Sequence, residues 1–327
     1  MKPESITIST PARLHITLID LSKTGYRKNG GIGFSINEFG HKFCFEKSED
    51  ICLRKLVDAG FSETYINRLE YNLRIIKCSH GKVGLYLASA DKVLRNTGFG
   101  SGTGAALALI EGFGLINGIQ LSREDMVKFS GRGGTSGIGI NSYFDGGFIL
   151  DAGRKIDSER FASSDLIKNP KHLPLMLGRC EMPNWPIGIV VLPSVNPVTL
   201  RQEQNLFDEV LPISIEDVAR ISYLSIFGTY ASVKENDFDS FSRSINMIQE
   251  CLWKKSEIGL YNDRVLKAML SLKDAGADCV GMSSIGPAIY FFARDFESAF
   301  AAAGNIFPPQ ALVRATVNNA GRTISYA

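Results

Sequence analysis

The most constraining feature of the sequence is a glycine-rich run that leads straight into a helical pattern. Residues 96–106 read NTGFGSGTGAA, and residues 105–111 form an apolar, helix-favouring run. Glycine permits positive φ and lets a ligand approach the backbone where a Cβ would block it. A helix that begins directly after such a loop points free N–H groups and its positive dipole end at that ligand. The run predicts an anion site, most often for phosphate, with hydroxyls from Ser101 and Thr103; the alternative is a tight turn whose glycines serve only packing.

Length and composition restrict the class of protein. The 327 residues predict about two domains, which we divide into residues 1–180 and 181–327. A net charge of +2 is too small to predict binding to nucleic acid or to an anionic membrane, and no apolar run has membrane-spanning length. The six cysteines are widely spaced, without metal-ligand spacing to the four histidines, as expected for reduced residues in a cytoplasmic enzyme.

The N-terminal segment predicts strands that line a pocket. Residues 5–20 are rich in β-branched residues and alternate in polarity, with Pro11 expected to interrupt or bend the pairing. On a strand, Arg13 and His15 share one face. We interpret them as an anion-facing pair, with a hydrogen-bonded structural histidine as an equally supported alternative. Asn29-Gly30 then predicts a hairpin turn with a basic tip, which is either solvated or close to a second anionic group.

Two further glycine loops follow in the sequence. Residues 130–140 (SGRGGTSGIGI) lie between a capped helix and residues with strand character, and they contain Arg132, Thr135 and Ser136. Such close flanking by ordered segments is not typical of a linker. Residues 281–287 (GMSSIGP) join two predicted strands. Asp151, at the end of a predicted apolar strand over residues 148–151, is either a magnesium or substrate ligand or a cap for the following turn.

The remaining pattern predicts a mixed α and β chain. We expect a helical region at residues 50–76, broken near Gly60, and helices at 105–115, 214–233, 238–253, 262–275 and 294–303. Strands are expected at 41–45, 83–88 and 187–192 and near the C-terminus. Residues 157–186 predict a loop-rich boundary between the domains.

The three glycine loops, in this order, resemble those of the GHMP superfamily of small-molecule kinases. More narrowly, PARLHITLID, NGGIG, GFGSGT, GRGGTSGIG, GGFILD and GMSSIGP resemble the β-ribofuranosylaminobenzene 5′-phosphate synthase family of methanopterin biosynthesis, and GRGGTSGIG is the most discriminating of these. The resemblance implies an α+β, GHMP kinase-like two-domain fold. Its N-terminal domain would be similar to ribosomal protein S5 and its C-terminal domain to ferredoxin. It also implies a homodimer.

The activity that the resemblance implies is a decarboxylating phosphoribosyl transfer. The donor would be phosphoribosyl pyrophosphate with Mg²⁺, the acceptor 4-aminobenzoate or a similar aromatic carboxylic acid, and the products a C-riboside phosphate, carbon dioxide and pyrophosphate. The chain departs from the family pattern at Asn29, at Asn96-Thr97, at Gly104 and over residues 152–154. The acceptor therefore stays open, and a C-nucleoside synthase using a heteroaromatic acid, an ATP-dependent GHMP kinase and a non-catalytic binding protein are the alternatives.

The resemblance and the motifs together assign candidate roles. We expect catalytic contributions from Arg13, His15, Arg132 and Asp151, and a magnesium ligand from among Asp20, Asp151 and Glu203. The residues expected to hold substrate or phosphate are Asn29, Gly30, Gly31, Gly98, Gly100, Ser101, Gly102, Thr103, Gly104, Gly133, Gly134, Thr135, Ser136, Gly137, Ser283, Ser284 and Gly286.

Overall fold

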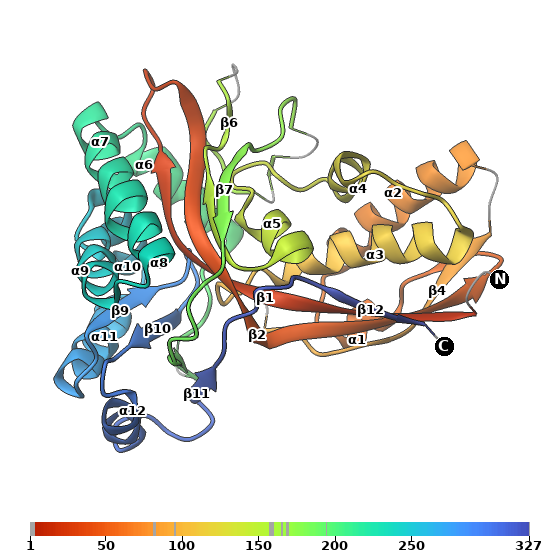
Figure 1. The fold of residues 1–327 in the computed structure, drawn as a ribbon. Helices are drawn as coiled ribbons and strands as arrows, with labels where there is room; N and C mark the ends of the chain where they lie inside the picture. The colour runs from red at the N-terminus through yellow and green to blue at the C-terminus, as the bar shows by residue number, and fades with distance from the viewer. Residues whose placement is uncertain are drawn as a thin grey trace.

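The computed structural model describes residues 4–80, 83–94, 96–156, 160–164, 166–167, 170–193 and 195–326. Two sheets and their covering helices make up the molecule (Figure 1). The larger sheet has the order β12-β1-β2-β4-β3, with β5 and β6 also paired to β2 and β7 paired to β5; the smaller has the order β11-β8-β10-β9.

A long antiparallel hairpin of β1 (Ser5–Asp20) and β2 (Arg27–Ser48) forms the centre of the larger sheet. The pairing shifts register between Thr10 and Ala12, which confirms that Pro11 interrupts it. The predicted hairpin turn at Asn29-Gly30 is wrong, because the turn lies between the two strands and both residues lie within β2. They keep the positive φ that suggested a turn, at 66° and 80°.

Apart from β12, the rest of the larger sheet and its helices come from the same half of the chain. The strands are β3 (Ile51–Cys52), β4 (Gly84–Ala90), β5 (Phe148–Asp151), β6 (Arg154–Lys155) and β7 (Met176–Cys180); the helices are α1 (Lys55–Asp58), α2 (Glu63–His80), α3 (Ser101–Asn117), α4 (Arg123–Ser130) and α5 (Ile138–Asp145). Helix α5 thus begins within the predicted second glycine loop and replaces the strand character expected after it. The supposed loop-rich boundary contains β7, which pairs with β5.

The smaller sheet consists of β8 (Ile187–Val191), β9 (Cys279–Met282), β10 (Ala288–Phe292) and β11 (Leu312–Ala315). Its half of the chain carries α6 (Leu200–Val210), α7 (Ile215–Tyr223), a π-helical segment (Leu224–Tyr230), α8 (Ala231–Glu235), α9 (Phe238–Gln249), α10 (Leu252–Gly259), α11 (Arg264–Asp274) and α12 (Phe296–Gly304). Helices α6 and α10 were not predicted as separate elements. None of the described helices is long and apolar enough to cross a membrane.

One hydrophobic cluster joins the two sheets. It holds Leu14 of β1 and Phe34 of β2 together with Phe241 of α9 and Phe292 of β10, all fully buried. The ring centroids of Phe34 and Phe292 are 5.9 Å apart. The chain then returns to the larger sheet through β12 (Thr323–Tyr326), which pairs with β1. The β1–β2 hairpin, from the N-terminal end of the chain, is thus in contact with elements of the C-terminal half.

An ion pair between the partly exposed Arg322 and the buried Glu111 fixes this return. Arg322 donates to both carboxylate oxygens of Glu111 on α3, at 2.9 and 2.5 Å, and the hydroxyl of Tyr143 donates to the same carboxylate.

Because Glu111 is buried, Arg322→Ala should lower the free energy of unfolding by about 3 kcal/mol, measured by urea denaturation. Arg314 forms a similar bidentate pair with Glu297, but both are exposed. Arg314→Ala is therefore the control with a much smaller loss. Equal losses of unfolding free energy in Arg322→Ala and Arg314→Ala would contradict a stabilising role for the Arg322–Glu111 pair.

Candidate active site

Strand β1 holds the first and third glycine loops against each other. The backbone N–H of Arg13 donates to the carbonyl of Phe99 in the first loop, at 3.0 Å. One step along the same face, the N–H of His15 donates to the hydroxyl of Ser283 in the third loop, at 3.0 Å, and its carbonyl accepts from the N–H of Ser284, at 2.8 Å. The Arg13 and His15 side chains therefore project from the strand at the junction of the two loops.

Glycines of these loops serve two different purposes. A Cβ on Gly98 (φ 100°) would lie 2.3 Å from the carbonyl oxygen of Ser283, and one on Gly286 would lie 2.1 Å from the backbone of Thr97. These glycines permit close packing, as in the alternative given above. Gly102 differs, because the nearest atom to its Cβ would be Tyr65 Cε2, 3.9 Å away. Protein packing does not require glycine at Gly102, which lines the cleft.

Helix α3 begins at the floor of the cleft with its N-terminus uncapped by a side chain. Its N-cap, Gly100, has φ 77° and ψ 18°, and the first turn holds no acidic residue. The first turn consists of Ser101, Gly102, Thr103 and Gly104, so the helix starts inside the glycine run. The positive end of the helix dipole and the adjacent hydroxyls favour an anion here.

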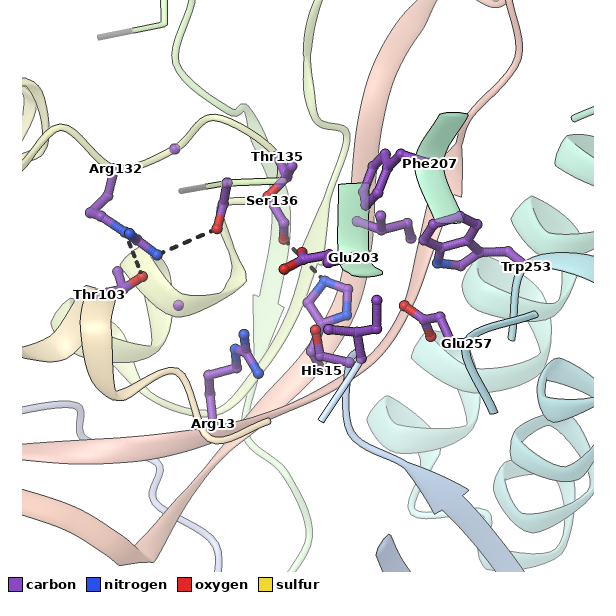
Figure 2. A pocket seen from close by; sticks show the side chains of 16 residues that line it. Arg13, His15, Thr103, Arg132, Thr135, Ser136, Glu203, Phe207, Trp253 and Glu257 are labelled. Carbon is purple, nitrogen blue, oxygen red and sulfur yellow. Dashed lines mark hydrogen bonds between the residues drawn. The ribbon is translucent and has the colours of Figure 1, made fainter. Parts of the chain in front are cut away.

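The second glycine loop closes the opposite side of the cleft. Arg132 Nε donates to Thr103 Oγ1 at 3.1 Å, and its Nη2 donates to Ser164 Oγ at 3.4 Å (Figure 2). Ser136 Oγ lies 3.3 Å from His15 Nε2, within hydrogen-bond distance, and also accepts from the N–H of Ile138. All three glycine loops therefore meet around Arg13 and His15.

The resulting cleft is continuous, because its two adjoining cavities share seven lining residues. The shared residues are Arg13, Thr103, Arg132, Ser164, Glu203, Ser284 and Ile285. At one end the cleft reaches the start of α3, and at the other it reaches α6 and α10. Figure 2 shows this division, with Arg132 and Thr103 on one side and Phe207 and Trp253 on the other.

Two guanidinium groups, those of Arg13 and Arg132, face the cleft near the start of α3. Burial and the neighbouring charge of Arg132 lower the pKa of Arg13 to about 10, which still leaves it protonated at neutral pH. Burial, with the charges of Arg13 and Lys254, holds the pKa of His15 well below 6.5, so its imidazole is neutral. Two guanidinium groups that face one partly buried cavity repel each other, and a bound anion relieves that repulsion.

Sequence reasoning missed the aromatic end of the cleft. Helix α6 presents Glu203 and Phe207, and α10 presents Trp253 and Glu257. Each pair combines a carboxylate with an aromatic ring four residues away, which places both on one face of a helix. This shared spacing was a usable signal, but the two helices come together only in the folded chain. Glu257 is held by Lys254, whose Nζ also donates to the carbonyls of Met282 and Ser284.

Most predicted site residues line the cleft, and several support it from behind. The lining members of the prediction are Arg13, His15, Gly98, Gly100, Ser101, Gly102, Thr103, Arg132, Gly133, Thr135, Ser136, Glu203, Ser284 and Gly286. The supporting members are Asn29, Gly30, Gly31, Gly104, Gly134, Gly137, Asp151 and Ser283.

Two of the three candidate metal ligands, Asp20 and Asp151, hold backbone groups and do not line the cleft. Asp20 accepts from the N–H and hydroxyl of Ser22 and from the N–H of Arg27, and so fixes the β1–β2 turn outside the cleft. Asp151 is fully buried behind the second loop and accepts from the N–H groups of Gly137 and Gly153. We therefore assign Asp151 a positioning role, in which its carboxylate holds the backbone of the second loop at Gly137.

The donor set fits a metal ion that is shared with a substrate. Among the described residues, no three His, Cys, Asp or Glu side chains gather into a metal site. Mg²⁺ is commonly bound by one or two carboxylates together with substrate phosphates, and it keeps several waters. Glu203 lines both parts of the cleft and could provide one such carboxylate.

Comparison with solved structures gives the class of the fold. The chain superposes on a homoserine kinase from Cytophaga hutchinsonii with a TM-score of 0.65 at 17% identity, covering 99% of this chain and 98% of the other. It superposes on mevalonate diphosphate decarboxylase from Staphylococcus aureus with a TM-score of 0.62 at 15% identity, covering 98% of each chain. The α+β GHMP kinase fold predicted from the glycine loops is confirmed.

Sequence relatives narrow the class to a family. β-Ribofuranosylphenol 5′-phosphate synthase from Methanothermobacter thermautotrophicus is 33% identical over 295 residues, covering 87% of this chain and 88% of the relative. The enzymes of the same name from Archaeoglobus fulgidus and Methanocaldococcus jannaschii are 31% and 32% identical, each over 87% of this chain and 87% and 88% of their own lengths. No protein-family model matches. The chain belongs to the family of β-ribofuranosylphenol 5′-phosphate synthases, which are C-glycoside-forming enzymes.

The different purposes of two loop glycines can be separated by experiment. Gly98→Ala should lower the free energy of unfolding by about 2 kcal/mol or more, because it combines a positive φ with a 2.3 Å contact. Gly102→Ala should leave the melting temperature unchanged or slightly raised, yet weaken binding of inorganic pyrophosphate about tenfold in titration calorimetry, a loss of about 1.4 kcal/mol. Unaltered pyrophosphate binding by Gly102→Ala would remove that residue from the anion site.

The buried carboxyl of Asp151 predicts a pH dependence of stability. Burial raises its pKa from an ordinary 3.8 to about 6, so the folded state binds the proton more tightly than the unfolded state. The contribution of Asp151 to the free energy of unfolding therefore falls as pH rises from about 4 to about 6. Relative to Asp151→Asn, the wild type should gain stability on acidification from pH 7.5 to pH 5, measured by urea denaturation. Parallel pH profiles for the two proteins would exclude this titration.

Proposed function

We propose that the chain joins phosphoribosyl pyrophosphate to an aromatic carboxylic acid through a carbon–carbon bond, with release of carbon dioxide and pyrophosphate. Family membership supports the C-riboside product. Phosphoribosyl pyrophosphate as the donor is supported mainly by two guanidinium groups, those of Arg13 and Arg132, which face one cavity at the start of α3. A substrate with two clusters of phosphate charge compensates for their repulsion.

The pyrophosphate fits best over the first turn of α3. The backbone is accessible at Gly102, the hydroxyls of Ser101 and Thr103 lie beside it, and no acidic side chain of that turn competes for the site. Arg132 is already oriented toward this point by its hydrogen bond to Thr103. These groups stabilise negative charge that develops on the leaving pyrophosphate, which is the main requirement of the reaction.

The acceptor ring attacks the ribose C1 through its carboxyl-bearing carbon. That carbon carries no proton, so the reaction needs no general base there. The C1–oxygen bond to pyrophosphate breaks as the carbon–carbon bond forms, and the electron pair of the carboxyl bond then restores the aromatic ring as carbon dioxide leaves. A neutral His15, with its pKa held low, can line this region without adding positive charge next to the cation-like C1.

A magnesium ion would be held by the donor pyrophosphate together with Glu203. Such an ion would neutralise phosphate charge and improve pyrophosphate as a leaving group. Glu203 is suited to this because it lines both the anion-binding end and the aromatic end of the cleft.

The names of the relatives bear on the acceptor. Their product is a ribosyl phenol, whereas the sequence motifs suggested the corresponding aminobenzene. A hydroxyl and an amino group in the para position both donate electrons to the attacking carbon. Either acid, 4-hydroxybenzoate or 4-aminobenzoate, therefore satisfies the proposed chemistry.

The decisive experiment is to incubate the protein with phosphoribosyl pyrophosphate, Mg²⁺ and a panel of benzoic and heteroaromatic acids. Stoichiometric release of carbon dioxide and pyrophosphate with at least one acid is the expected result. Arg132→Ala should raise the KM for the donor at least about tenfold, because a charge-assisted contact is lost. Conversion of ATP to ADP with a phosphorylated product, and no pyrophosphate release with any acid, would instead establish a kinase.

A further inference from the structure

The aromatic end of the cleft holds a buried hydrogen-bond donor that needs an acceptor. Trp253 lines the cleft and is 1% exposed, and its indole Nε1 has no hydrogen-bond partner among the described residues. A buried indole N–H usually finds an acceptor, because an unsatisfied polar group is costly. Figure 2 shows the nitrogen edge of the ring facing the cavity, on the side of Glu257. A ligand that brings an acceptor would satisfy it.

The surrounding side chains suit a planar ring. Trp253 and Phe207 meet edge to face, with ring centroids 5.1 Å apart and planes at 69°. Leu18 and Ile285 complete an apolar wall around them. A flat aromatic ligand can stack on one of these rings and meet the edge of the other, the two geometries that aromatic pairs prefer.

The polar groups at this end complement a hydroxyl group. Glu257 is one helical turn beyond Trp253 on α10, is 4% exposed and is held by Lys254, whose Nζ is 2.6 Å from Oε2. The indole N–H donates and the carboxylate accepts, so the pair matches a hydroxyl, which does both. An aromatic amine offers N–H donors, but its lone pair is delocalised into the ring and accepts poorly.

Building on the function proposed above, we propose that Trp253 and Glu257 form the subsite that selects the ring substituent of the acceptor, favouring a hydroxyl over an amino group. The carboxyl-bearing carbon of the acid then faces the cationic end of the cleft. As that carbon bonds to C1, electron density flows from the ring oxygen, whose O–H donates to Glu257. The oxygen, now with carbonyl character, accepts from Trp253. The electron pair of the broken carboxyl bond returns to the ring, and the hydroxyl keeps its proton.

The chain provides a matched pair of variants, because it has two tryptophans. Trp253→Phe keeps an aromatic ring and removes the donor; Trp185→Phe makes the same change beside Phe238 and Phe241, away from the cleft. In Trp253→Phe the ratio of kcat/KM for 4-hydroxybenzoate to that for 4-aminobenzoate should fall about tenfold, and in Trp185→Phe it should not change. An unchanged ratio in Trp253→Phe overturns the proposal.

A binding measurement tests the same subsite without turnover. In Trp185→Phe the native Trp253 is the sole indole fluorophore, and 4-hydroxybenzoate, added with inorganic pyrophosphate, should change its emission saturably. Unchanged emission overturns the subsite even if Trp253→Phe does not fold. A saturable change without carbon dioxide release in the turnover assay would leave the subsite standing and refute the proposed reaction. Turnover in which Trp253→Phe leaves the preference between the two acids unchanged would support the proposed reaction and refute the subsite.

Discussion

The arrangement of the cleft depends on the main-chain hydrogen bonds that β1 makes beyond its own sheet. Through Arg13 and His15 the strand binds Phe99 of the first glycine loop and Ser283 and Ser284 of the third. The loops are far apart in the sequence, yet each is fixed to adjacent positions of one strand. Side chains at those positions therefore project between the two loops, just beyond the register shift at Pro11. Arg13 and His15 are thus both part of the scaffold and part of the site.

Charge then separates the two ends of the cleft. Arg13, Arg132 and the start of α3 make one end suited to phosphate, while Phe207 and Trp253 make the other suited to a ring. The structural relatives, a homoserine kinase and a mevalonate diphosphate decarboxylase, show that this fold is shared by enzymes of different names. A common fold does not define a reaction, so the individual side chains must carry the functional argument.

The sequence predicted what depends on local pattern. The glycine run before α3, the strand that carries Arg13 and the alternation of helices and strands all follow from short-range rules. The hairpin turn predicted at Asn29-Gly30 was wrong because these residues adopt positive φ within β2, and positive φ is not confined to turns. The sequence did not reveal that the carboxylates of Asp20 and Asp151 accept hydrogen bonds from nearby backbone N–H groups. Trp253 was missed because it reaches the cleft only once α6 and α10 pack together.

The close approach of Gly98 and Gly286 locks the first and third glycine loops together at one edge of the cleft. Their backbones lie nearer to Ser283 and Thr97 than any side chain would allow, and the Ser283 hydroxyl also donates to the Gly98 carbonyl. This edge of the cleft joins segments nearly two hundred residues apart, and separating them would break several hydrogen bonds at once. Arg132 of the second loop, by comparison, contacts Ser164 and Thr103 through its side chain. The first and third loops are therefore joined through their backbones, whereas the second loop meets the cleft through side chains.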